Sequence, residues 1–335
     1  MRALLIVNPH ATSTTRGRRD VIVRALASAV DLEVVQTRYR GDATRLAATA
    51  ASDKFGLVMT LGGDGTVNEA VNGLLGGTAW ARAPRTADLR RAAEAGPADA
   101  VAAPPDAADL PALAALPGGN ANVFTRSLQL PTDPVDAVGR LIEDLALGRE
   151  RRIGLGTANG RYFTFNAGLG LDAEVVRAVE GRRAHGRTLT PALYFRTALR
   201  QYYQVTDRRQ PAITISEPTG LSRDAVYLCI VSNSAPWTYL GHRPVNTNPD
   251  ASFDTGLDIL AFRRLGTIAT LRTLRQMLTE RTEPPRGRSV VAGHDLAAIH
   301  LGAARPMAFQ LDGEYMGEVD EVLFRAVPRA LRVIG

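Results

Sequence analysis

A buried strand that runs straight into a glycine-rich turn and then a helix is the pattern that most constrains this chain, and it occurs twice. The apolar run 55–61 leads into Gly-Gly-Asp-Gly-Thr at 62–66 and a helical pattern over 67–75. The apolar run 113–116 leads into Pro-Gly-Gly-Asn-Ala-Asn at 117–122 and another helix. Glycine lets a ligand approach the backbone, and the N–H groups at a helix start favour phosphate. Two such turns at the carboxyl edge of one parallel sheet predict a ligand site there.

The remainder of the N-terminal half also alternates strands with helices, which predicts an open, mostly parallel α/β sheet. One stretch interrupts this pattern: Ala and Pro make up 21 of the 38 residues from 79 to 116, which indicates an insertion at about 79–112 with a short helix around 89–95. The expected strands are 3–7 and 32–36, and the expected helices are 18–29, 42–52 and 133–147, the last with Thr132 as N-cap.

The pattern changes after about residue 149. Short strand-like runs separated by turn residues predict an antiparallel β domain, interrupted by helices at about 189–203 and 266–279. The expected strands are 152–155, 162–165, 212–216, 225–231, 257–262, 297–301, 307–311 and 321–326.

Composition excludes several classes of protein. A length of 335 residues with 45% hydrophobic residues indicates a globular chain of roughly two domains. The longest apolar runs fall far short of the ~20 residues that span a bilayer, and the N-terminus resembles a first strand more than a signal peptide. The lone Cys229 excludes an internal disulfide, so cytoplasmic residence is expected. The lone lysine, Lys54, has no glycine-rich loop around it, which argues against Walker A proteins and protein kinases.

The basic residues are concentrated in one segment. Residues 177–209 hold eight Arg against Glu180 and Asp207, a local charge of +6 that equals the net charge of the whole chain. Four aromatic residues lie in the same window. Such a segment suits an anionic membrane surface or a nucleic acid, and it also suits a solvated helix whose aromatic residues pack inward.

Four acidic or amide positions add chemistry to the two glycine turns. Asp64 would repel a phosphate unless a cation lay between them, so the first turn favours a nucleotide with Mg²⁺. Asn8 follows the first strand at the same expected sheet edge. Near the C-terminus, Asp312-Gly313 is typical of a hairpin turn. Glu314 next to it could accept a proton from a hydroxyl that attacks a γ-phosphate.

Five motifs in order resemble the diacylglycerol kinase catalytic-domain family, which includes bacterial diacylglycerol kinases and sphingosine kinases. They are Asn8-Pro9, GGDGTVNEAVNGL, PGGNANVF, FNAGLGLDAEVV at 165–176 and LDGE at 311–314. The resemblance covers nearly the whole chain outside the insertion. It implies an NAD kinase/diacylglycerol kinase-like fold with an α/β nucleotide-binding domain over 1–148 and a β-sandwich domain over 149–320. Residues 321–335 would return to the first domain.

The resemblance also implies an ATP- and Mg²⁺-dependent lipid kinase. Glu314 would be the general base, with Asp312 and Asp64 as further catalytic residues. Mg²⁺ would be held by Asp64, Asp312 and, at a separate structural site, Asp254. The residues implied to surround ATP are Asn8, Pro9, His10, Ala11, Thr12, Thr37, Gly62, Gly63, Asp64, Gly65, Thr66, Val67, Asn68, Glu69, Gly119 and Asn120.

Three departures from the family pattern are visible. The first loop has Thr12 where the family has glycine, and Val123 stands where bacterial diacylglycerol kinases have an Asp of the second turn. Thr255 replaces one Asp of the structural metal loop, which puts that metal site in question.

Two other functions stay open at this point. A kinase of a soluble substrate that resembles NAD kinase shares the GGDG turn, and a nucleotide-binding regulator without activity would account for the lost Asp. A nucleic-acid partner is not expected. The lipid is open between diacylglycerol and relatives such as a long-chain base. The resemblance allows a homodimer and predicts transient docking at the inner membrane surface through 177–209.

Overall fold

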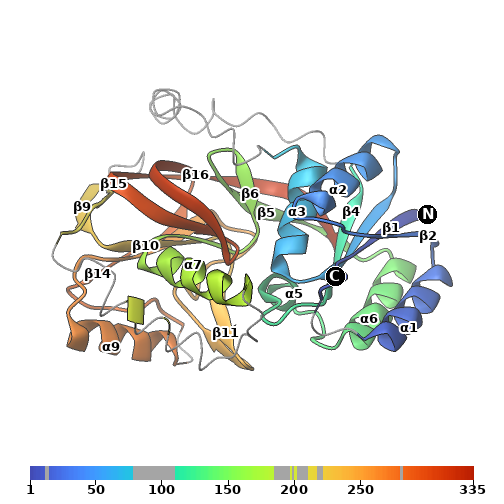
Figure 1. Ribbon diagram of the computed structural model, residues 1–335, viewed down its shortest axis with the longest axis horizontal. Coiled ribbons are helices and arrows are strands. Elements are labelled where there is room, and N and C mark those ends of the chain that lie inside the picture. Colours follow the sequence, from blue (N-terminus) through green and yellow to red (C-terminus); the bar gives the residue numbers. More distant parts are fainter. Residues whose placement is uncertain are drawn as a thin grey trace.

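The computed structural model describes residues 1–11, 15–77, 110–184, 197, 200, 201, 210–216, 222–279 and 282–335. Figure 1 shows two lobes. Helices cover the strands of the N-terminal lobe, and the C-terminal lobe is built mainly of strands.

The N-terminal lobe is a parallel sheet covered by helices on both faces. Its strands follow the order β2-β1-β3-β4, and neighbouring strands pair in parallel. Leu4 and Ile6 pack with α2 and α3, whereas Leu5 and Val7 pack with α1 and α6, so β1 is apolar on both faces. The strands are β1 (Arg2–Val7), β2 (Asp31–Gln36), β3 (Leu57–Gly62) and β4 (Ala112–Pro117). The helices are α1 (Arg16–Ala27), α2 (Asp42–Ser52), α3 (Asp64–Leu75), α5 (Val123–Ser127) and α6 (Pro134–Ala146).

Two helix starts differ from the sequence expectation. Helix α3 begins at Asp64, three residues earlier than expected, because Gly63 takes the extended N-cap conformation. Helix α6 is capped by Asp133, whose side chain accepts a hydrogen bond from the Val135 N–H, and not by Thr132. A carboxylate is favourable at a helix N-terminus because it also meets the positive end of the helix dipole.

The C-terminal lobe encloses its own core between antiparallel strands. Side chains from eight of its strands and from β16 form one cluster, in which Phe309 and Phe324 are fully buried. The elements before residue 250 are β5 (Glu150–Ala158), β6 (Arg161–Phe163), β7 (Asn166–Gly170), α7 (Leu171–Ala184), β8 (Ile213–Ser216), β9 (Ser222–Val226), β10 (Leu228–Ser232), β11 (Thr238–Leu240) and β12 (Arg243–Val245). The later elements are β13 (Leu257–Phe262), α9 (Thr267–Met277), β14 (Val290–Leu296), β15 (Ala298–Leu311) and β16 (Glu314–Ile334).

The last strand joins the two lobes. β16 is 21 residues long and pairs first with β15 in the C-terminal lobe. Its far end pairs with β4 in parallel, Val333 opposite Leu113, and Leu331 packs into the N-terminal core. A single 14-stranded sheet therefore runs through the molecule, and the hairpin turn at 312–313 starts the strand that ends in the first lobe.

Several elements of the C-terminal lobe differ from the expected strands. Of the run 162–165, only 162 and 163 lie in a strand, β6, and the motif at 165–176 forms β7 and the start of α7. Its glycines permit close packing: a Cβ on Gly168 would lie 1.9 Å from the Asp172 carboxylate. The expected helix at about 89–95 and most of the expected helix at 189–203 lie outside the described residues.

Candidate active site

The two glycine turns lie against each other at the carboxyl edge of the parallel sheet. The Gly118 N–H donates to the Gly62 carbonyl at 2.8 Å. A Cβ on Gly118 would lie 2.8 Å from the Gly62 Cα, and one on Gly119 would lie 2.7 Å from the Gly63 Cα. Side chains would therefore push the turns apart. The glycines serve the packing of one turn on the other, as well as leaving backbone N–H groups accessible.

The first loop is tied to helix α3 at the same edge. The Asn8 Nδ2 donates to Thr66 Oγ1 at 3.2 Å, and Asn8 Oδ1 accepts from the His10 N–H at 2.9 Å. The Thr37 N–H, after β2, donates to the Val7 carbonyl at 2.9 Å. The structure thus brings three strand ends together. Pro9 and Ala11 lie in this loop, and Thr12 lies outside the described residues.

Asp64 is the first residue of α3 and also caps the next short helix. Its Oδ1 accepts from the Phe124 N–H at 3.0 Å, at the start of α5. Burial raises the pKa of Asp64 to about 6, and the negative charge of Asp312 adds to the rise. A nearby cation would offset that cost, because it favours the ionised carboxylate.

Asp312 is buried and accepts five hydrogen bonds. Oδ2 receives the Asn68 Nδ2 at 2.8 Å, the Thr164 N–H at 2.7 Å and the Thr164 Oγ1 at 2.8 Å. Oδ1 receives the N–H groups of Phe165 at 3.0 Å and Asn166 at 3.2 Å. Burial raises the pKa of Asp312 while these donors oppose the rise. The carboxylate thereby joins α3 of one lobe to the start of β7 and the two residues before it in the other lobe.

Asn68 and Asn72 hold α3 to strand β6. Both Nδ2 atoms donate to the Tyr162 carbonyl at 3.0 Å, and Asn72 Oδ1 accepts from the Tyr162 N–H at 2.9 Å. Both side chains are buried, one helical turn apart. Asn68 was expected beside ATP, and the structure places its amide between the lobes.

Glu314 lies on the first turn of α3. Its Oε1 is 2.1 Å from where a Cβ of Gly65 would be, so the carboxylate rests on the bare Cα of that glycine. Its Oε2 accepts from Arg40 at 3.0 Å. The hairpin turn that presents Glu314 has positive φ at Asp312 and Gly313, 48° and 76°, as expected for an Asp-Gly turn.

Glu69 caps helix α2. Its carboxylate accepts from the Gly41 N–H at 2.7 Å and the Ala43 N–H at 3.2 Å. Gly41 is the N-cap of α2 and has no side chain to fill that position. Glu69 therefore fixes the turn that carries Arg40, and through Arg40 it supports Glu314.

Arg161 is a site residue that the sequence analysis did not identify. It opens β6 after an Asn-Gly turn whose φ values are positive, and it donates to Asn68 Oδ1 at 2.8 Å. Burial lowers the pKa of Arg161, while the charges of Glu314, Asp312 and Glu69 oppose this. Its buried Nε has no partner among the described residues. The Asn-Gly pair was the available signal, because it predicts a hairpin and places the next side chain.

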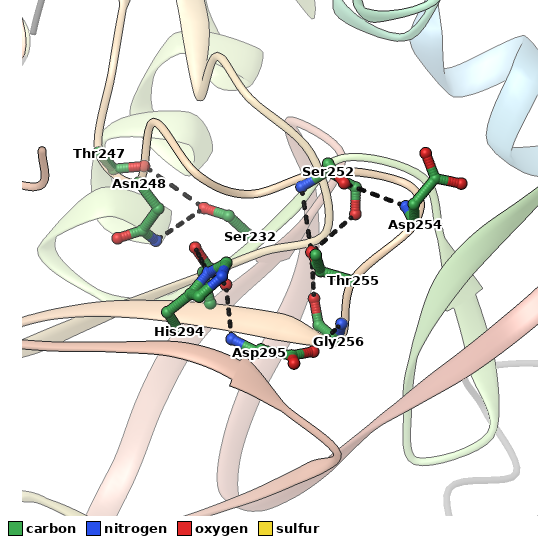
Figure 2. Close-up of polar contacts among 10 residues, drawn as sticks. Ser232, Thr247, Asn248, Ser252, Asp254, Thr255, Gly256, His294 and Asp295 are labelled. Carbon is green, nitrogen blue, oxygen red and sulfur yellow. Dashed lines mark hydrogen bonds and ion pairs between the residues drawn. The ribbon is translucent and has the colours of Figure 1, made fainter. Parts of the chain in front are cut away.

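Asp254 lies in a separate loop. Figure 2 shows it beside Ser252, whose Oγ accepts from the Asp254 N–H, and Thr255, whose Oγ1 accepts from the Ser252 N–H. The loop is anchored at Gly256, which donates to Asp295 Oδ1 at 2.7 Å. The Asp254 residue is exposed. Across the described part of the chain, no three His, Cys, Asp or Glu side chains gather closely enough to hold a metal ion.

A further buried carboxylate, Asp172, is linked through Gln310 to the hairpin turn at 312–313. It accepts from Gln310 Nε2 at 2.8 Å, and Gln310 Oε1 accepts from the Gly313 N–H at 2.9 Å. Burial raises the pKa of Asp172 to about 6, and the hydrogen bond from Gln310 opposes part of that rise.

Comparison with known proteins finds relatives of this chain. Residues 2–158 match the family model of the diacylglycerol kinase catalytic domain. A diacylglycerol kinase of Staphylococcus carnosus is 25% identical over 320 residues, which cover 95% of this chain and 90% of the relative. One of Bacillus subtilis is 26% identical over 331 residues, which cover 94% and 90%. The crystal structure of a diacylglycerol kinase from Bacillus anthracis has a TM-score of 0.68 at 20% identity, covers 99% of this chain and 96% of that chain, and shows the same fold.

The likeness to this solved structure shows an NAD kinase-like fold, which confirms the predicted fold class. Residues 2–158 match the diacylglycerol kinase catalytic domain and relatives along nearly the whole chain are named diacylglycerol kinases, so the chain is a lipid kinase. Within the described residues, no helix is long and apolar enough to cross a membrane.

Replacing Gly65 by Ala should lower the activity of the enzyme and leave its stability nearly unchanged. The new Cβ would lie 2.1 Å from Glu314 Oε1, and the flexible carboxylate can move away at little cost. We expect kcat for lipid phosphorylation to fall about tenfold or more, because a misplaced catalytic group costs on the order of 10²-fold. The urea unfolding free energy should change by less than about 1 kcal/mol.

The matched control is Gly139→Ala in helix α6, where nothing lies within 4 Å of the added Cβ. It should leave kcat unchanged. Equal kcat for Gly65→Ala and the wild type would show that the position of Glu314 on Gly65 does not matter.

Asp172→Asn should change how stability depends on pH. The folded carboxyl has a pKa of about 6 and an ordinary value near 3.8 when unfolded. Between these values the folded chain holds a proton that the unfolded chain has lost, so stability falls as pH rises from about 4 to about 6. The variant cannot lose stability in this way. The difference in unfolding free energy, variant minus wild type, should therefore be larger at pH 7.5 than at pH 4.5 by on the order of 1–2 kcal/mol. Urea unfolding at both pH values measures it, and parallel pH curves for the two chains would contradict the assignment.

Proposed function

We propose that this chain transfers the γ-phosphoryl group of ATP, in the presence of Mg²⁺, to a hydroxyl of diacylglycerol or a closely related lipid. The observation that carries the proposal is the position of Glu314, which rests on Gly65 at the start of α3 and is held by Arg40. This puts a carboxylate at a helix N-terminus beside two glycine turns, where phosphate binding is favoured.

The three strand ends and α3 supply the nucleotide site in this proposal. Backbone N–H groups of the 62–65 turn and the positive end of the α3 dipole would face the phosphates. The loop at 8–11 is fixed to Thr66, so it would border the same site. Asn68 and Glu69 contribute indirectly, because their side chains bind the other lobe and α2.

Mg²⁺ fits at Asp64 and does not fit at Asp312. Mg²⁺ is usually bound through one or two carboxylates together with substrate phosphates and water. Asp64 offers a hard carboxylate whose pKa of about 6 leaves it mostly ionised near neutral pH. The oxygens of Asp312 already accept five hydrogen bonds, so we assign it a positioning role. When bound, Mg²⁺ would offset the charge that the transfer develops on the phosphate oxygens.

Glu314 is the proposed general base. The lipid hydroxyl oxygen attacks the γ-phosphorus, its proton passes to the Glu314 carboxylate, and the bond to the ADP oxygen breaks. Arg161 and Arg40 carry positive charge beside this carboxylate and can offset the negative charge of the phosphates. The lost Asp of the second turn is not required in this scheme, because Asp64 already caps α5 through the Phe124 N–H.

Diacylglycerol is the first substrate to test because the relatives from Staphylococcus carnosus and Bacillus subtilis are named diacylglycerol kinases. The assay follows transfer of labelled γ-phosphate from ATP with Mg²⁺ to a panel of diacylglycerol, monoacylglycerol, a long-chain base and NAD. Diacylglycerol or a related lipid should be labelled. Labelling of NAD alone would replace the proposal with a soluble-substrate kinase, and ATP binding without transfer to any acceptor would replace it with a regulator.

Glu314→Gln and Asp64→Asn should each lower kcat on the labelled lipid by about 10²-fold or more, since each removes a charge needed in the transition state. Both substitutions keep the side-chain shape, so the midpoint of urea unfolding should stay near that of the wild type. A variant that keeps the wild-type kcat would remove its residue from the mechanism.

A further inference from the structure

Helix α9 presents apolar side chains to solvent. Its inward residues are Thr270, Thr273 and Met277, two of which are polar. Ile268, Leu271 and Leu274 point outward and are 79%, 57% and 41% exposed. Spacing of three residues places them along one side of the helix. Figure 1 shows α9 at the outer end of the C-terminal lobe. A helix that only covers a core turns its apolar side chains inward. Helix α9 instead exposes three of its apolar side chains to solvent.

Arginines surround this apolar stripe. Arg263 and Arg264 precede the helix, Arg272 and Arg275 lie within it, and all four are exposed. Residues 259–279 contain no Asp or Glu, so the segment has a local charge of +4. In the part of the chain that the structure describes, none of these four arginines forms an ion pair within 4.0 Å.

We propose that α9 and the arginines at 263–264 form a docking surface for an anionic lipid bilayer. This inference rests on the proposed function, in which the lipid substrate comes from a membrane. Ile268, Leu271 and Leu274 enter the boundary between headgroups and acyl chains, and the arginines bind the lipid phosphates. The segment 177–209, expected from the sequence to dock, lies mostly outside the described residues.

Charge favours a lipid surface over a second copy of this chain. A two-fold contact through α9 would place the same four arginines of each copy against one another. Like charges in contact are unfavourable, whereas anionic headgroups pair with every arginine.

Contacts connect this surface to the active site. The Met277 carbonyl at the end of α9 accepts from the Asn246 N–H at 2.8 Å, directly after hairpin β11–β12. Leu240 of that hairpin is also exposed, at 45%. Arg126 of α5 donates to the Gly241 carbonyl of the hairpin at 3.2 Å, and α5 is the helix that Asp64 caps. Hydrogen bonds therefore join the end of α9, through the hairpin, to the helix that binds Asp64.

Cosedimentation of the full chain with vesicles, without nucleotide, tests the surface. One vesicle is phosphatidylcholine and the other contains about 30% phosphatidylglycerol. The double variants Ile268→Ser with Leu271→Ser, and Arg272→Glu with Arg275→Glu, should each weaken binding to the anionic vesicle about tenfold or more. The matched controls Leu147→Ser, at a residue 63% exposed in the N-terminal lobe, and Arg24→Glu on α1 should stay within twofold of the wild type.

A second readout separates docking from catalysis. Phosphorylation of a short-chain, monomeric diacylglycerol without vesicles should be the same in both double variants as in the wild type. Unchanged vesicle binding in the double variants overturns the proposal, and so does a dimer that the Ile268→Ser with Leu271→Ser variant dissociates while vesicle binding persists. Loss of vesicle binding in a chain that phosphorylates no lipid would support the docking surface and reject the proposed function.

Discussion

The interaction on which the rest of the structure depends is the set of five hydrogen bonds to Asp312. One donor, Asn68, comes from helix α3, and the other four come from Thr164, Phe165 and Asn166 in the C-terminal lobe. A buried carboxylate is costly to desolvate, and it is stable here because every donor is in place. The same residue forms the turn that places Glu314, so the bond between the lobes also fixes the position of the proposed general base.

A chain of direct contacts joins the residues around Glu314. Glu69 caps α2 and fixes Arg40, Arg40 holds Glu314, and Glu314 occupies the space that Gly65 leaves open. Two residues expected beside ATP, Asn68 and Glu69, therefore act on the site through the neighbours that they bind. Glycine in the turns serves packing between backbones, which explains why two glycine pairs at 62–63 and 118–119 face each other.

The N-terminal lobe could be predicted from the sequence because buried parallel strands alternate with amphipathic helices and each glycine turn marks a strand end. The position of both turns at one edge of the sheet could also be predicted, because each turn follows a parallel strand. The Asn-Gly pair indicates the turn before Arg161, but the hydrogen bonds of Asn68 and Arg161 could not be predicted, because their partners lie more than 90 positions away. β7 was missed because the glycines of FNAGLG resemble a loop, whereas Gly168 permits close contact with Asp172 of α7. The domain boundaries and the roles of individual site residues stay predictions.

Hydrogen exchange of the backbone amides of Thr164, Phe165 and Asn166 in Asp312→Ala and in the wild type tests the link between the lobes. These amides donate to the carboxylate, so we expect them to lose protection in the variant while amides of β3 keep theirs. Loss of kcat should accompany this local opening. Unchanged protection at the three amides, or an equal loss of protection throughout β3, would contradict a specific link between the lobes at Asp312.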